Sequence, residues 1–336
     1  MPLSNTKAFG QPGRVRRHPF SLDPMTDTAS QPTGQAGLTP QAEPPAPPDT
    51  RTSLLHDLGE IGRDLWGARD LLLQLTRRDV TIRYKQAVMG FGWALFMPLM
   101  TLVASVLIRA LVQTASGRGM EPASIIGMAV KSLPWAFFVG SLGFATPSLI
   151  ANANLVTKIY FPREVLPLSA VLAQCFDTSL GVIAFTLALP FLGFHPTWAL
   201  LWVPVLVVLL FLFTAGVCLF LSCANLFFRD VKYIVQIFLT FGIFFTPVLF
   251  EPSMLGHRLS RIIWVNPLTP LLEGLRLAIA EGHNLAEPLR QVTGAGNSIL
   301  VWSPASLWYS GVWAVAGCLI GAVIFHRAAH VFAEYA

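Results

Sequence analysis

Charge is scarce in this chain of 336 residues: only 12% of the residues are Asp, Glu, Lys or Arg, whereas hydrophobic residues make up 54%. Soluble domains carry about a quarter charged residues, so this balance favours a bilayer environment over water. The formal net charge is only +5, and most basic residues stand beside apolar runs. That placement suits orientation in a membrane and contact with anionic lipid headgroups, and it argues against nucleic acid as a partner.

Cysteine and the common catalytic motifs are scarce or missing as well. The four cysteines are Cys175, Cys218, Cys223 and Cys318. All four lie in apolar segments without metal-ligand spacing, so we expect small buried side chains rather than a disulfide framework. The chain has no HExxH, no GxSxG and no aspartate-rich repeat.

A nucleotide-binding motif is also absent, because GAGNS at Gly294 has neither the lysine nor the spacing of GxxxxGK[ST]. His326 and His330 are four residues apart and share a face if the segment is helical. Such a terminal pair is more often solvated than bound to metal. We therefore expect no cofactor and no metal in this chain.

The first fifty residues differ in composition from the rest. PTGQAGLTPQAEPPAPPD is rich in Pro, Gln and Ala, and it carries too little apolar surface to offset the entropy cost of ordering. The start, MPLSNTKAFGQPGRVRRHPF, lacks the continuous apolar run of a cleavable signal peptide. We expect a disordered Pro-rich cytoplasmic tail over 1–51, an amphipathic and basic juxtamembrane segment over 52–88, and a membrane domain over 89–336.

An amphipathic helix is predicted to begin after Ser53, a suitable N-cap. Apolar residues recur at helical spacing from Leu54 to Trp66, with acidic and basic residues between them. This segment is too polar to cross a bilayer but suits its interface, with Trp66 at headgroup depth. A helix packed on another soluble domain is the alternative interpretation.

Six apolar runs approach the roughly 20 residues that cross about 30 Å of hydrocarbon. They are Phe91–Leu111, Pro134–Ile150, Leu166–Leu189, Ala199–Phe220, Ile234–Phe250 and Leu307–Phe325. Lipid offers no hydrogen-bond partner to open backbone groups, so each is expected to be a helix, with Pro98, Pro134 and Pro147 kinking or capping. The predicted fold is all-α and integral to the membrane, with six transmembrane helices.

Basic residues predict the orientation of these helices. The side expected to be cytoplasmic carries Arg77, Arg78, Arg83, Lys85, Lys158, Arg163, Arg229, Lys232 and Arg327. The short loops of the other side carry fewer, namely Arg118 and Lys131, and the loop around His195 carries none. Short loops decide the orientation, so both termini are expected in the cytoplasm.

The segment from Glu251 to Ser306 is apolar in part but too short for two further spans. Pro267 and Pro270 interrupt it, which predicts a re-entrant or interfacial helical hairpin at the outer face. Irregular backbone at membrane depth is tolerated only beside protein or a watery cavity. The hairpin is therefore a candidate wall of such a cavity.

Only two ionisable residues, Arg109 and Asp177, are predicted to lie inside the spans. Intramembrane charge often marks a transport path, and so few groups argue against a proton- or sodium-coupled carrier. Asp177 either pairs with a partner, meets a polar substrate, or forms local hydrogen bonds with Gln174, Thr178 and Ser179.

The stretch NLVTKIYFPREVLPLSA, from Asn154 to Ala170, lies between two apolar runs on the predicted cytoplasmic side. Its two prolines prevent a regular helix and stiffen an exposed, charged element. Such an element is suited to dock into a groove on a partner and to move the adjoining helices as a lever. An ordinary loop with orienting charges is the alternative.

Four blocks of sequence, in this order and spacing, resemble the transmembrane subunits of polysaccharide-exporting type-2 ABC transporters. The blocks are LLLQLTRRDVTIRYKQAVMGFGWALFMPLM, NLVTKIYFPREVLPLSAVLA, FFRDVKYIVQIFLTFGIFFTPVLF and NPLTPLLEGLRLAI. The likeness covers about residues 54 to 330. It implies six transmembrane helices, a homodimer, and two separate ATPase subunits that hold the ATP and Mg²⁺ and drive export of a lipid-linked glycan. The long Pro-rich start departs from the family pattern and leaves a regulatory or docking role open.

The resemblance also implies roles for residues of this chain. Leu54–Asp70 resembles the gate helix, and Asn266–Ile279 resembles the external re-entrant part. The implied contact with the ATPase is Ile159, Tyr160, Phe161, Pro162, Arg163 and Glu164. The implied headgroup-binding residues are Arg77, Arg78, Arg83 and Lys85, whose alternative role is to orient the chain. The implied channel lining, with lipid contact or packing as the alternative, is Trp93, Phe96, Phe137, Phe138, Asp177, Phe244 and Phe245.

Two other functions stay open at this point. One is an ABC permease that transports a smaller lipid or a drug by the same mechanism. A membrane enzyme acting on lipid-linked sugars needs convergent carboxylates or a histidine near the interface, and the predicted spans offer nearly none. Transport of a lipid-linked polysaccharide across the inner membrane of a bacterium is therefore the expected function.

Overall fold

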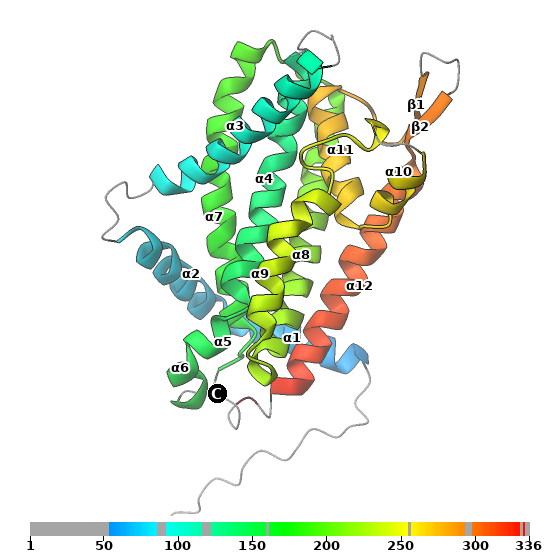
Figure 1. The fold of residues 1–336 in the computed structure, drawn as a ribbon. Helices are drawn as coiled ribbons and strands as arrows, with labels where there is room; N and C mark the ends of the chain where they lie inside the picture. Colours follow the sequence, from blue (N-terminus) through cyan, green and yellow to red (C-terminus); the bar gives the residue numbers. More distant parts are fainter. Residues whose placement is uncertain are drawn as a thin grey trace, which may run out of the picture. The chain divides into compact units, whose positions relative to one another are not determined.

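The computed structural model describes residues 54–85, 92–115, 122–158, 161–254, 257–292, 298–329 and 332. These residues are mostly helical, which confirms the predicted all-α class (Figure 1). The predicted tail, residues 1–51, lies outside the described residues, and so do Ile159, Tyr160 and His330.

Four helical segments are long and apolar enough to cross a membrane: Ile126–Ala145, Val165–Phe191, Trp198–Phe227 and Pro304–Ala328. They belong to α4 (Pro122–Ala145), α7 (Val165–Ala188) with η1 (Leu189–Leu192), η2 (Trp198–Leu201) with α8 (Trp202–Phe227), and α12 (Pro304–Ala328). Each contains one of the predicted spans or overlaps it. The segment Ile126–Ala145 begins earlier than the predicted span Pro134–Ile150, because Pro134 lies inside α4 and does not cap it.

The two other predicted spans correspond to α3 (Gly92–Ala115), with 24 residues, and α9 (Val231–Phe245), with 15. A bent pair of helices near the end of the chain provides a possible fifth span by length and composition. The count of six spans thus stays a prediction.

The long helices pack into a bundle whose tightest crossing joins α8 and α12. A Cβ atom on Gly216 would lie 2.5 Å from the backbone carbonyl of Gly317, closer than real Cβ atoms come. Gly321 meets the backbone of Gly216 in the same way. Small residues allow helix backbones to approach in a membrane, where packing rather than water exclusion holds helices together.

At one end of the bundle, called here the basic end, lie α1 (Leu54–Gly67), α2 (Arg69–Tyr84), α5 (Ser148–Ala151) and α6 (Ala153–Lys158) (Figure 1). The predicted gate helix, Leu54–Asp70, is interrupted at Ala68. Beyond the interruption α2 packs on α7, whereas α1 packs on α12. Ile61 and Leu75 are buried there in one apolar cluster, and Trp66 is 73% exposed. The placement of this segment in the membrane interface stays a prediction.

At the opposite end, called here the hairpin end, η3 (Pro252–Met254) leads to α10 (His257–Trp264) and α11 (Leu268–Ala280). The last two helices are bent by 99° at the break before Leu268. Pro267 stands at this break as predicted, but Pro270 lies in the first turn of α11. An antiparallel pair of strands, β1 (Leu289–Val292) and β2 (Ser298–Trp302), follows and was not predicted.

Candidate functional site

The four predicted headgroup-binding residues lie at the basic end, but α2 divides them between two faces. Arg77, Arg78 and Lys85 line a shallow cavity of about 430 Å³ together with Gln74, Thr81 and Ile82. At 3.6 residues per turn these positions share one side of the helix, and Arg83 lies on the other side. The cavity is called the α2 groove below.

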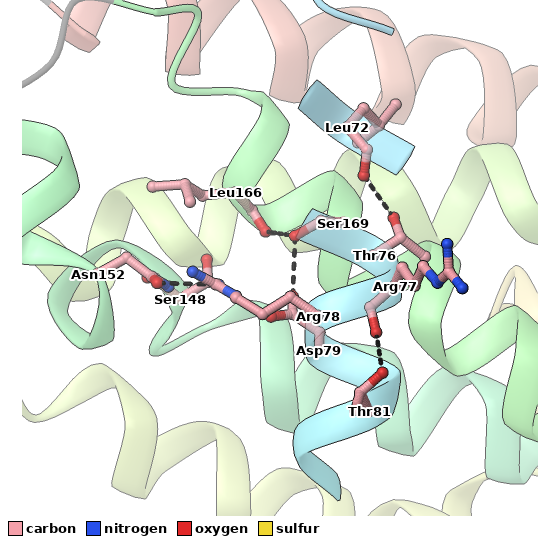
Figure 2. Close-up of polar contacts among 10 residues, drawn as sticks. All are labelled: Leu72, Thr76, Arg77, Arg78, Asp79, Thr81, Ser148, Asn152, Leu166 and Ser169. Atoms are coloured by element: carbon pink, nitrogen blue, oxygen red, sulfur yellow. Dashed lines mark hydrogen bonds and ion pairs between the residues drawn. The ribbon is translucent and has the colours of Figure 1, made fainter. Parts of the chain in front are cut away.

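Hydrogen bonds to the helices behind α2 hold part of this groove in place (Figure 2). The Arg78 guanidinium lies 2.9 Å from the Asp79 carboxylate and donates to the Asn152 side-chain oxygen at 3.0 Å. The other Asp79 oxygen accepts from the Ser169 hydroxyl at 3.0 Å. Arg77 is exposed, and its guanidinium points away from this network. Arg78 is thus a positioned cation, whereas Arg77 and Lys85 extend toward solvent.

Arg83 faces the bundle and forms a different contact. Its guanidinium lies 2.5 Å from the Asp177 carboxylate of α7, and both side chains are largely buried. The Tyr84 hydroxyl donates to the other Asp177 oxygen at 2.6 Å. Burial, followed by this hydrogen bond, raises the pKa of Tyr84 above its usual value. Of the three interpretations of Asp177, pairing with a partner is confirmed, and the partner is Arg83.

The predicted ATPase-contacting segment is described from Phe161 to Glu164, immediately before α7. The Glu164 carboxylate lies 3.0 Å from Nδ1 of His326, near the end of α12. Nε2 of the same imidazole lies 3.7 Å from the Glu60 carboxylate of α1. A single histidine therefore stands between the predicted coupling segment and the predicted gate helix.

Two further contacts strengthen this junction. Arg327 pairs with Asp57 of α1 at 2.8 Å, and the Asp57 side chain is only 5% exposed. Arg163 donates to the backbone carbonyl of Ala329 and lies over the Phe332 ring, 5.8 Å from its centroid. The coupling segment, α1 and the end of α12 are thus joined by charged and hydrogen-bonded contacts, called here the three-element junction.

The predicted channel-lining aromatics fall into two groups. Phe137 and Phe138 are buried in the bundle, where Phe138 stacks on Phe213 with ring centroids 6.1 Å apart. Phe244 and Phe245 are 64% and 70% exposed on α9, and Phe96 on α3 is also exposed. The side chain of Trp93 lies outside the described part of α3. Phe96, Phe244 and Phe245 are thus exposed on this chain, and the channel-lining role of these aromatics stays a prediction.

Lys131, predicted to lie in an outer loop, instead falls within the candidate span Ile126–Ala145, so the sequence-based count of charges in the spans missed it. It belongs to a buried charged cluster nearer the hairpin end. Glu273 of α11 pairs with Arg276 at 2.6 Å and lies 3.6 Å from the Lys131 ammonium of α4. Arg276 also reaches Glu281 at 2.5 Å. Lys131 and Glu273 are fully buried. Lys131 therefore joins α4 to α11 through this ion pair. Among the described residues, no three His, Cys, Asp or Glu side chains are grouped to hold a metal ion.

Comparison with known proteins agrees with this architecture. The family model for the ABC-2 type transporter matches residues 70–279. An O-antigen export system permease protein RfbA from Myxococcus xanthus is 31% identical over 259 residues, which cover 74% of this chain and 95% of that protein.

Two permeases of the same name from Klebsiella pneumoniae are each 30% identical. Their matches cover 63% and 60% of this chain and 81% and 77% of those proteins. The family match extends over more than half of the sequence. Four helical segments of this chain are long and apolar enough to cross a membrane. This chain therefore belongs to the ABC-2 type transporter family and is a multi-pass permease subunit of that family.

Proposed function

We propose that this chain is the channel-forming subunit of an ATP-driven exporter of a lipid-linked polysaccharide of the O-antigen, capsular or teichoic-acid class. The observation that carries the proposal is the match to an O-antigen export permease over 95% of that protein's length. The subunit works as a homodimer with two copies of a separate ATPase, which bind the ATP and Mg²⁺. It resides in the inner membrane, with both termini in the cytoplasm.

We place the entry of the cargo at the α2 groove, because its cations suit the charge of a lipid-linked glycan. A lipid-linked glycan carries a phosphate or pyrophosphate at the inner leaflet, and a cation near the membrane surface contributes about 1 kcal/mol to the attraction of such charge. Arg77, Arg78 and Lys85 line one groove at the basic end. Arg83 is held by Asp177 instead, so it positions the groove helix against α7 and does not contact the headgroup.

We propose that force from the ATPase subunits reaches the channel through the three-element junction. In this mechanism, closure of the ATPase pair displaces the segment that contains Phe161 and Glu164. Because Glu164 contacts His326, and His326 lies near Glu60, the displacement moves the end of α12 and α1 together. The gate helix then moves with the coupling segment.

Co-purification of this chain with an ABC ATPase subunit from the same organism, followed by reconstitution into proteoliposomes, tests the proposal. ATP hydrolysis should rise when the lipid-linked polysaccharide of the producing strain is added, and polymer should appear in the vesicle lumen. A complex with a catalytically inactive ATPase is the control. Stimulation by a small lipid but not by the glycan would assign another cargo, and movement of cargo by the isolated chain would overturn the mechanism.

A further inference from the structure

A second cavity lies at the hairpin end, far along the bundle from the α2 groove. Its volume is about 580 Å³, within the range of small-molecule sites. It is bounded by α10, the first turn of α11, β2 and the start of α12. Its chemically distinctive lining residues are Arg261, Trp264, Trp302, Ser303, Ser306 and Tyr309.

The walls of this cavity are held by hydrogen bonds that cross between elements. The Tyr309 hydroxyl donates to the Val265 carbonyl at 2.5 Å, which fixes α12 against the turn after α10. The fully buried Trp302 donates through Nε1 to the Leu285 carbonyl at 2.9 Å. Its ring meets that of Trp264 edge to face, with centroids 6.1 Å apart. The cavity is therefore built from residues that other contacts already position.

The lining is mostly apolar, because Val265, Pro270, Leu300, Val301 and Ala305 lie beside the aromatic rings, and it also carries a cation and hydroxyl groups. The rings of Trp264 and Tyr309 offer flat apolar surface, the side chain of Arg261 offers a cation, and Ser306 offers a hydroxyl. An acyl chain would fill the apolar part but would take polar groups out of water without replacing their hydrogen bonds, which costs free energy. A sugar ring satisfies both parts, because its C–H face packs on an aromatic ring and its hydroxyls accept and donate hydrogen bonds.

We propose that this cavity binds a sugar unit of the exported polysaccharide as it leaves the channel. The inference rests on the proposed function, which identifies the cargo as a glycan and the hairpin end as the exit. The cavity is separate from the basic groove at which the lipid headgroup enters. A glycan held there does not slide back while the ATPase subunits reset, so the site favours outward movement.

The test uses the full complex in nanodiscs and lipid-free polysaccharide, released by mild acid from the producing strain's own glycolipid. Binding is measured by titration calorimetry. Trp264→Ala removes one aromatic wall and Arg261→Gln removes the cation. Each should weaken binding about tenfold, the effect expected of about 1.4 kcal/mol. Trp308→Ala is the matched control, because Trp308 is 77% exposed on α12 and does not line the cavity.

Normal co-purification with the ATPase and an unchanged melting temperature show that a variant is folded, and Arg261→Gln changes an exposed side chain. Weak binding by the two cavity variants with normal binding by Trp308→Ala supports the proposal. Equal binding by all three variants overturns it, and so does a wild-type complex that binds no lipid-free polysaccharide. The latter failure is distinct from failure of the proposed function, which is read from stimulation of ATP hydrolysis by the lipid-linked form.

Discussion

At the scale of single residues, the pairing of Arg83 with Asp177 decides what the basic cluster can do. Four cations within nine residues all suit an anionic headgroup by composition. Because Asp177 lies 2.5 Å from the Arg83 guanidinium, that charge is already neutralised inside the protein. Arg78 is likewise paired, with Asp79 at 2.9 Å, so the exposed cations of the α2 groove are Arg77 and Lys85. Arg83 contributes to the attachment of α2 to α7.

Removal of the Asp177 charge should destabilise the protein. Asp177→Ala leaves the largely buried Arg83 guanidinium without its counter-ion and removes the acceptor of the Tyr84 hydroxyl. We expect a loss of about 3 kcal/mol in the free energy of unfolding. Denaturant titration of the detergent-solubilised protein measures it.

Asp230→Ala is the control for this substitution, because Asp230 is exposed and makes no side-chain cap of α9. It should change the stability by no more than about 0.5 kcal/mol. Equal effects of the two variants would contradict a structural role for the pair.

His326 lies between Glu164 of the predicted coupling segment and Glu60 of the predicted gate helix. Under the proposed function, loss of the Glu164 contact should therefore reduce coupling without a loss of assembly. In Glu164→Gln the charge that faces His326 is removed, while the size of the side chain is kept. Basal ATP hydrolysis should persist, and the amount of polymer exported per ATP hydrolysed should fall several-fold. Vesicle export and phosphate release, measured on the same sample, give this ratio.

Glu287→Gln is the matched control, because Glu287 is exposed at the hairpin end and has no part in the three-element junction. A normal export ratio is expected for it. A normal ratio in Glu164→Gln as well would exclude Glu164 from force transmission.

At the scale of elements, the sequence predicts those features that are determined by residues close together along the chain. The uninterrupted apolar runs of α7, α8 and α12 suffice to predict membrane helices, because helix hydrogen bonds close within the segment. The strands β1 and β2 are only four and five residues long, so the sequence between them, with Gly294 and Gly296, is the main local signal of a hairpin there. The ion pair of Lys131 with Glu273 joins residues 142 positions apart in sequence, and no local pattern predicts it.

The crossing of α8 and α12 predicts that two neighbouring glycines differ in their tolerance of a methyl group. In Gly216→Ala the new Cβ would lie 2.5 Å from the Gly317 carbonyl carbon, so the helices must separate. A cost of about 1–3 kcal/mol is typical of such overpacking. Thermal unfolding in detergent should show a lower melting temperature.

Gly317→Ala is the paired control at the same crossing, because a Cβ there meets nothing within 4 Å. Alanine favours a helix over glycine, so this variant should be as stable as wild type or more stable. A reversed order of the two melting temperatures would refute the close approach at Gly216.

At the scale of the whole molecule, the arrangement in the membrane predicts opposite locations for the two ends of one long helical segment. Thr197 immediately precedes Trp198–Phe227, and Asp230 follows it; both residues are exposed. The basic residues collect at the end that contains α2, so that end should face the cytoplasm. Cysteines placed at the two positions in a cysteine-free background should therefore react from opposite sides.

Thr197→Cys should react with a membrane-impermeant maleimide in intact spheroplasts, and Asp230→Cys only after the membrane is opened. The four native cysteines must first be replaced, because Cys175 and Cys318 are only half-buried. Labelling of both sites after permeabilisation is the control for accessibility. Labelling of Asp230→Cys alone in intact spheroplasts would show that the membrane orientation is the reverse of the predicted one. The α2 groove would then face away from the cytoplasm and could not receive cargo from it.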